Sequence, residues 1–213
     1  YVCIPFGNGM TASDLNVGII YIVAVTSLVV TAIIMAGWSA GNKYAIMSAF
    51  RSGAQIVSYE VPMVISILSV IIIVGSFKMG DFVMAQQHLW LVFLQPLAFL
   101  IYFISAVAET NRAPFDLPEA ESEIVAGYFI EYTGMKFALF FLAEYTNMVT
   151  VSAVATTLFL GGWTLFGLEK IIPPFLIFLS KVLALIFVII WFRWTFPRLR
   201  VDQLMNFCWK VLL

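Results

Sequence analysis

Long apolar stretches dominate this sequence and constrain its fold more than any other feature. A helix needs about 20 predominantly apolar residues to cross the hydrocarbon core of a bilayer. Five stretches qualify, and a sixth runs to the end of the sequence: 15–38, 60–77 (with a possible earlier start near Tyr44), 89–108, 136–166, 174–194 and, partially, 204–213. The runs are continuous rather than alternating, which favours helices over barrel strands. We therefore expect an all-α, polytopic transmembrane helix bundle.

The composition excludes several other classes of protein. Hydrophobic residues make up 62% of the 213 residues and charged residues 11%, against about 45–50% and about 25% in soluble domains. The net charge of −1 offers no basic surface for nucleic acid. Cys3 and Cys208 stand at opposite ends of the chain and His88 is the only histidine, so we expect no metal site and no iron–sulfur cluster bound by this chain alone.

Basic residues in the predicted loops fall mainly on one side of the membrane. Seven lie on one side and two, Lys78 and Lys170, on the other; the seven are Lys43, Arg51, Arg112, Lys136, Arg193, Arg198 and Arg200. Cytoplasmic loops carry an excess of Lys and Arg. This bias predicts that loop 109–135 faces the cytoplasm, or the matrix of a mitochondrion. The sequence begins with Tyr1 and ends inside an apolar run, so we expect a single membrane domain, 1–213, cut from a longer chain.

Loop 109–135 also carries most of the acidic residues. Seven of the twelve lie between positions 109 and 144: Glu109, Asp116, Glu119, Glu121, Glu123, Glu131 and Glu144. Asp116 followed by Glu119 is a capping-box pattern, and Glu119 and Glu123 would be neighbours on one helix face. One interpretation is a solvated acidic loop whose carboxylates favour a helix dipole. The other is a cluster of coupled carboxyl groups that share protons.

Three charged residues lie within the predicted spans. Glu144 is eight residues into the fourth, Lys181 is seven residues into the fifth, and Glu60 lies near the inner edge of the second, beside Pro62. A charge at mid-bilayer costs at least about 2.5–3.5 kcal/mol, so these groups must face protein or water, be neutral, or be paired. A buried ion pair that fixes helix packing is one possibility. A carboxylate chain of Glu60, Glu109 and Glu144 that carries protons into the membrane is the other.

Three blocks of the sequence resemble a known family. Residues 108–145 read AETNRAPFDLPEAESEIVAGYFIEYTGMKFALFFLAEY, and two shorter blocks are YAIMSAFRSGAQIVSYEVP (44–62) and PRLRVDQLM (197–205). Together they resemble the H subunit of respiratory complex I, the proton-pumping NADH:quinone oxidoreductase, called subunit 1 in mitochondria. The similarity covers essentially the whole chain. Members of this family usually begin with a further transmembrane helix and an amphipathic stretch, which do not precede Tyr1 here.

The resemblance implies a role at the junction of the membrane arm and the hydrophilic arm, where a chamber admits quinone, the substrate. FMN and iron–sulfur clusters would belong to partner subunits of the membrane arm and quinone module, and this chain alone would bind no cofactor. Eight acids would form the proton pathway: Glu60, Glu109, Asp116, Glu119, Glu121, Glu123, Glu131 and Glu144. Arg112, Phe115, Arg51 and Arg198 would lie at the quinone chamber. The expected location is a bacterial plasma membrane or a mitochondrial inner membrane.

Other functions remain open from the residues alone. Membrane subunits of energy-converting hydrogenases share the architecture and a looser version of the acidic loop. A structural role, in which the acids seat the peripheral arm, would need no proton transfer. An autonomous channel or transporter would be expected to contain inverted repeats, and the two halves of this sequence contain no convincing repeat.

Overall fold

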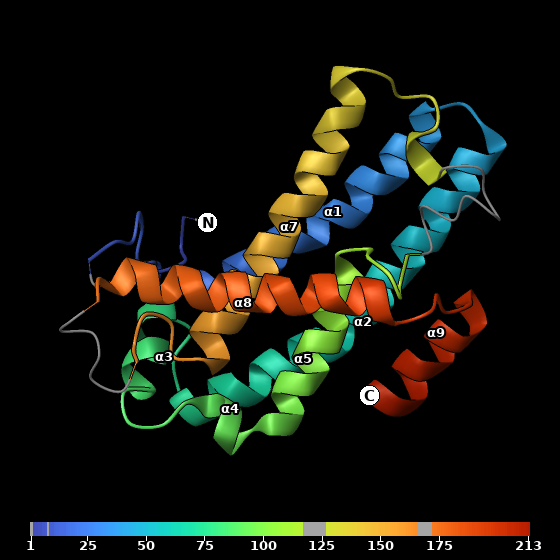
Figure 1. Ribbon diagram of the computed structural model, residues 1–213. Helices are drawn as coiled ribbons and strands as arrows, with labels where there is room; N and C mark the ends of the chain where they lie inside the picture. The colour runs from blue at the N-terminus through green and yellow to red at the C-terminus, as the bar shows by residue number, and fades with distance from the viewer. Residues whose placement is uncertain (1, 8, 117–126, 166–171) are drawn as a thin grey trace. The chain divides into compact units, whose positions relative to one another are not determined.

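The computed structural model describes residues 2–7, 9–116, 127–165 and 172–213, and its regular elements there are all helices (Figure 1). Four of the described helices are long and apolar enough to cross a membrane: α1 (Gly18–Ser39), α2 (Lys43–Val74), α7 (Met135–Phe159) and α8 (Pro174–Thr195). A shorter apolar helix, α5, spans Pro96–Glu109. The predicted all-α membrane bundle is confirmed for the described residues.

Helix α2 is much longer than the predicted range 60–77. It has 32 residues, which corresponds to about 48 Å at 1.5 Å per residue. Its first half carries Ser48, Ser52 and Gln55, spaced four and three residues apart and all buried. These polar side chains lower the hydropathy of the segment although they face the protein interior. The helix therefore begins near Tyr44, the earlier of the two predicted starts. Glu60 is the eighteenth residue of the helix, well inside it rather than near its edge.

The third predicted span, 89–108, is not one continuous helix. It divides into α4 (Leu91–Leu94) and α5, with the break at Gln95, whose φ of −131° and ψ of 64° are not helical. Pro96 follows directly, and a proline both lacks an N–H donor and disfavours the helical conformation in the residue before it. A further short helix, α3 (Met79–Ala85), precedes α4.

The last three predicted spans agree with the helices to different degrees. Helix α7 stops at Phe159, earlier than the predicted end at residue 166, because Gly161 and Gly162 adopt φ values of 71° and 55°, which lie outside the helical region. Helix α8 agrees with the predicted range 174–194 to within one residue. The sixth stretch forms α9 (Val201–Phe207), continued by a π-helical turn, η3 (Cys208–Leu212).

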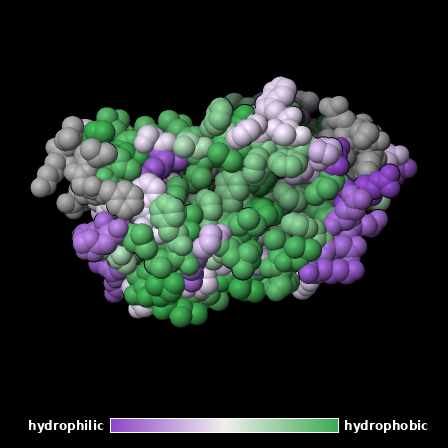
Figure 2. All heavy atoms as spheres, turned by 60° about the horizontal axis from the view of Figure 1, so that its bottom comes forward, coloured by the Kyte–Doolittle hydropathy of each residue, from purple (hydrophilic) through white to green (hydrophobic). Residues whose placement is uncertain are grey.

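The chain forms two compact units. The first unit comprises Tyr1–Ala24, Met63–Phe103 and Val149–Ile189, and the second comprises Val25–Pro62, Ile104–Met148 and Ile190–Leu213. The seven basic residues predicted for one side of the membrane all lie in the second unit, whereas Lys78 lies in the first. Apolar side chains cover much of the face shown in Figure 2. Such a surface is typical of a protein that contacts lipid or partner subunits.

Lys181 of α8 stabilises the end of α7 within the first unit. Its Nζ donates hydrogen bonds to the carbonyl oxygens of Leu160, Gly162 and Thr164, at 2.6, 3.0 and 2.7 Å, and lies 4.6 Å from the centre of the Trp90 ring. These carbonyls belong to the turn that follows α7, and the ammonium group supplies their hydrogen-bond donor. Lys181 therefore binds backbone carbonyls, and the ion pair in the second unit involves other residues.

Candidate functional site

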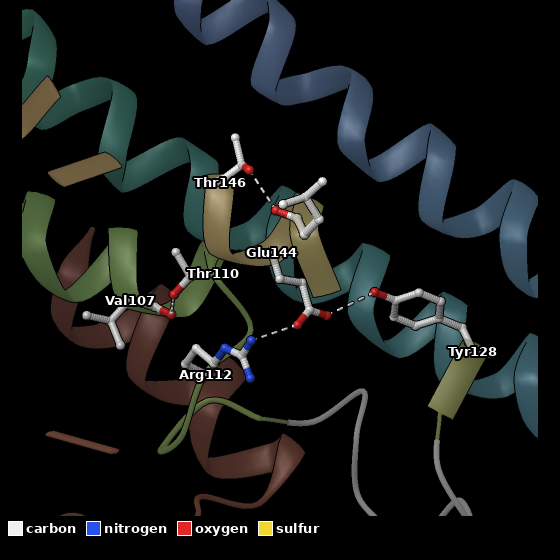
Figure 3. A network of polar contacts seen from close by, with 7 residues as sticks. Val107, Thr110, Arg112, Tyr128, Glu144 and Thr146 are labelled. Atoms are coloured by element: carbon white, nitrogen blue, oxygen red, sulfur yellow. Dashed lines mark hydrogen bonds and ion pairs between the residues drawn. The ribbon is translucent and has the colours of Figure 1, made fainter. Parts of the chain in front are cut away.

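Glu144 lies at the centre of a polar network in the second unit. It is the tenth residue of α7, and its two carboxylate oxygens have different partners (Figure 3). Arg112 Nη2 donates to Oε2 at 3.0 Å, and the Tyr128 hydroxyl donates to Oε1 at 3.3 Å. The Arg112 and Glu144 side chains are only 6% and 12% exposed. A buried ion pair, one of the two possibilities left open by the sequence, is therefore present, and its cation is Arg112 from the acidic loop.

A tight turn after α5 places Arg112. Asn111 has a φ of 50°, in the left-handed region that Asn tolerates better than most residues. The amide Nε2 of Gln55 in α2 donates to the carbonyls of Ala108 and Phe115, both at 2.8 Å, and so joins the two ends of this turn. The guanidinium group of Arg112 also lies 4.7 Å from the centre of the Tyr145 ring. Gln55 and Tyr145 thus hold the arginine toward Glu144.

Glu109 and Glu60 form a second acidic element near this turn. Glu109 is the last residue of α5, lies outside the four membrane-length helices and is 6% exposed. Burial, and then the nearby Glu60 carboxylate, raise the pKa of Glu109 to about 7, against a hydrogen bond with Asn147 that lowers it. Glu60 itself is half-buried and accepts a hydrogen bond from the Ser27 hydroxyl of α1. A carboxyl group with a pKa near 7 can gain and lose a proton under physiological conditions.

Buried polar atoms without a protein partner gather in the second unit. Among the described residues, five such atoms belong to this unit: Ser52 Oγ, Gln55 Oε1, Ser105 Oγ, Glu109 Oε2 and Asn111 Oδ1. They come from the first half of α2 and from the end of α5 with its turn. Buried polar atoms in proteins almost always have a hydrogen-bond partner, and internal water commonly supplies it. The arrangement is therefore suited to hold water beside Glu109.

The remaining predicted site residues are distributed over the second unit. Phe115 is buried, with its ring centre 5.5 Å from that of Tyr59. The exposed Arg198 donates a hydrogen bond to the carbonyl of Asp116, and the exposed Glu131 accepts one from Asn42 at 3.1 Å. Arg51 is half-buried in α2. Glu119, Glu121 and Glu123, and with them the capping-box prediction, lie outside the described residues.

Sequence reasoning missed the groups that orient the charges. Tyr128, Gln55 and Ser27 were not among the candidates, although each binds or positions a residue that was. The spacing of Ser48, Ser52 and Gln55 along one helix face was the available signal for Gln55. Tyr128 and Ser27 lie 16 and 33 residues from their partners, and no local pattern indicates such contacts. Among the described residues, no three His, Cys, Asp or Glu side chains lie close enough together to hold a metal ion.

Comparison with known proteins identifies the family. The sequence model of the NADH dehydrogenase family matches residues 1–213. The chain belongs to the NADH dehydrogenase family. Its curated relatives include proteins named as the H subunit of NADH-quinone oxidoreductase from Carboxydothermus hydrogenoformans (53% identical, 100% of this chain and 61% of the relative), Geobacillus thermodenitrificans (49%, 99% and 63%) and Dehalococcoides mccartyi strain CBDB1 (52%, 100% and 59%).

Membership of the NADH dehydrogenase family confirms the resemblance seen in the sequence. The chain spans about 60% of the length of the curated relatives given above. The network around Glu144 and the buried Glu109 thus belongs to a membrane-embedded part of an NADH dehydrogenase family protein.

Proposed function

We propose that this chain is part of the H subunit of a proton-pumping NADH:quinone oxidoreductase in a bacterial plasma membrane. In this proposal it forms part of the quinone chamber and couples quinone reduction to proton translocation. Other subunits of the membrane arm and quinone module are its partners, and they hold the FMN and the iron–sulfur clusters. The relatives named for this activity and the four membrane-length helices support the assignment.

One observation carries the coupling role: a buried carboxyl with a pKa near 7 lies beside a second carboxylate and a buried ion pair. Glu109 is close enough to Glu60 for the charge of one to affect the other, and Glu144 is bound by Arg112 and Tyr128. Coupled carboxyls change protonation together when a nearby charge changes. A charge change at bound quinone would therefore be felt at Glu109, whose pKa lies near 7.

The proposed sequence of events follows from these positions. Reduction of a quinone consumes two electrons, supplied by a partner subunit, and two protons. Withdrawal of protons from the chamber leaves Glu109 ionised, and its charge then repels that of Glu60. Proton uptake by Glu109 relieves the repulsion. Water beside the unpaired atoms of Ser52, Gln55 and Ser105 would carry the proton to it. The loop acids Asp116, Glu119, Glu121, Glu123 and Glu131 extend this pathway toward the cytoplasm.

Arg112 contributes to both parts of the proposal. Its guanidinium group binds the Glu144 carboxylate, and its turn joins α5 to the acidic loop. Phe115, Arg51 and Arg198 are proposed to lie along the quinone chamber. Movement of the turn in response to quinone would break or lengthen the contact between Arg112 and Glu144 and transmit the change along α7.

Replacement of the carboxyls tests the relay. The variants Glu60→Gln, Glu109→Gln and Glu144→Gln are introduced into the full-length subunit of the assembled complex, and quinone reduction and proton pumping are measured in vesicles. We expect each to lower both activities while assembly persists. Asp202→Asn, an exposed acid of α9, is the control and should retain both. Wild-type turnover and pumping in all three Gln variants would reject the relay.

Co-purification tests the assignment of the whole complex. A tag on this subunit should recover a flavin-containing partner that oxidises NADH. Recovery of a nickel–iron hydrogenase partner in its place would reject this proposal in favour of an energy-converting hydrogenase.

A further inference from the structure

An open cavity of about 470 Å³ lies in the second unit. It is lined by Ser39, Ala40, Glu131, Tyr132, Thr133, Met135 and Lys136. The volume falls within the range of roughly 300–1,000 Å³ typical of small-molecule sites. The proton-relay proposal assigns a role to only one lining residue, Glu131, as a member of the acidic loop.

Hydrogen bonds fix the walls of this cavity. The hydroxyl of Tyr132 is hydrogen-bonded to the Ser39 hydroxyl and donates to the carbonyl of Ala36 at 2.9 Å. Its ring packs against Phe140, with 5.0 Å between ring centres. Asn42 donates to Glu131 at 3.1 Å. The end of α1 is thus joined to the segment that leads into α7, so the cavity is a built feature of the unit.

Opposite charges share the cavity without neutralising each other. Glu131 and Lys136 are both exposed, and in the described part of the chain no ion pair within 4 Å joins them. The Glu131 carboxylate retains accepting capacity beyond its bond with Asn42. The Lys136 ammonium has three donors. A ligand that carries both a phosphate and an ammonium group would satisfy both ends.

The position of the cavity indicates where such a ligand comes from. Its lining includes the last residue of α1 and the first two residues of α7, which are both helices of membrane length. The ends of such helices lie at the level of lipid headgroups. Trp38, next to Ser39, is 72% exposed, and Met135 and Leu139 are 77% and 54% exposed. Tryptophan is enriched at the membrane interface, and exposed apolar side chains beyond it suit acyl chains.

We propose that this cavity binds the headgroup of a zwitterionic phospholipid with a primary ammonium group, of the phosphatidylethanolamine type. Lys136 binds the phosphate, and Glu131 accepts hydrogen bonds from the ammonium. The hydroxyls of Ser39 and Thr133 complete the polar contacts. A choline headgroup has no N–H donor and fits the Glu131 end less well, and a glycerol headgroup lacks the positive charge that Glu131 attracts.

Site-directed photocrosslinking tests the occupant directly. A benzophenone amino acid replaces Ala40, a lining residue, in the full-length subunit of the assembled membrane complex. We expect irradiation to yield a covalent adduct with a phosphatidylethanolamine mass. A dominant crosslink to a partner polypeptide, or to a quinone, would overturn the proposal. The readout is the mass of the adduct and does not depend on whether the complex reduces quinone.

Lipid competition tests the roles of the two charges. The delipidated complex is exposed to equal amounts of ethanolamine, choline and glycerol phospholipids, and bound lipids are measured by native mass spectrometry. Glu131→Gln should reduce the preference for ethanolamine over choline about three- to fivefold, the range expected for one exposed charge contact. Lys136→Gln should weaken binding of all three lipids. Lys210→Gln and Asp202→Asn, exposed charges outside the cavity, should change nothing. Unaltered selectivity in both cavity variants would refute the assignment.

Discussion

The ion pair between Arg112 and Glu144 predicts that a double substitution destabilises the protein less than either single substitution. Their atoms lie 3.0 Å apart and the side chains are 6% and 12% exposed. At an effective dielectric constant of about 20, two such charges attract by roughly 5 kcal/mol before desolvation is subtracted. Removal of one partner from a buried pair costs about 3–5 kcal/mol, because the other charge stays buried without compensation.

Three variants separate this pairing from simple loss of packing. Glu144→Gln removes the negative charge that faces the Arg112 guanidinium, and Arg112→Met removes the positive charge that faces the Glu144 carboxylate. Each should cost about 3–5 kcal/mol. The double variant contains no buried charge at the site, so it should be more stable than either single variant. This order of stability is measured as the thermal midpoint of the purified complex, detected by release of the tagged subunit.

Glu131→Gln provides a matched control, because it is the same chemical change at an exposed carboxylate of the same unit. It should alter stability by no more than about 0.5 kcal/mol. If the double variant were destabilised by the sum of the two single effects, the pair would not be an energetic unit. The reasoning that links Arg112 to Glu144 would then fail, whatever the activity of the variants.

Three further predictions concern other parts of the chain. Gly37→Ala should lower the stability by about 1–3 kcal/mol through overpacking, because the added Cβ would lie 2.3 Å from the Cβ of Ala49. Gly80→Ala is the control, since its added Cβ meets nothing within 4 Å. Thermal melting compares the two variants. Lys181→Met should lower the amount of assembled subunit in membranes, since it removes three hydrogen bonds to the turn that follows α7. Because the pKa of Glu109 is raised in the folded protein, the stability should fall as the pH rises from about 4.5 to about 7. Glu109→Gln should flatten this dependence. Thermal melts at several pH values measure it.

The sequence predicts the membrane helices well where an apolar run is interrupted by few polar residues. The predicted range 174–194 differs from α8 by one residue. The prediction fails where polar side chains face the protein, as Ser52 and Gln55 do in α2, because hydropathy counts them as solvent-exposed. It also fails at Gln95, where the conformation set by Pro96 breaks an otherwise apolar run.

The candidate acids could be named from the sequence, but their partners could not. An acid within an apolar run is visible because burial of a charge is costly, which is how Glu144 was found. Its partner Arg112 lies 32 residues away, and only the fold brings them together. The sequence left pairing of Glu144 as one of several possibilities, and the structure shows that it is paired. The structure adds the identity of the cation and the way in which Gln55 holds its turn.

Lys181 and Glu109 have different consequences for function. In the first unit, the three donors of the Lys181 ammonium bind three backbone carbonyls of the turn after α7, so no N–H of this group can be removed without loss of a contact. In the second unit, Glu109 retains a buried oxygen without a protein partner among the described residues, and a proton can be added there without breaking a contact at that atom. Addition of a proton to Glu109 therefore breaks fewer contacts than removal of an N–H from Lys181. This difference is the physical reason to seek the coupling chemistry around Glu109 and Glu144, and to treat Lys181 as a residue that fixes helix α7.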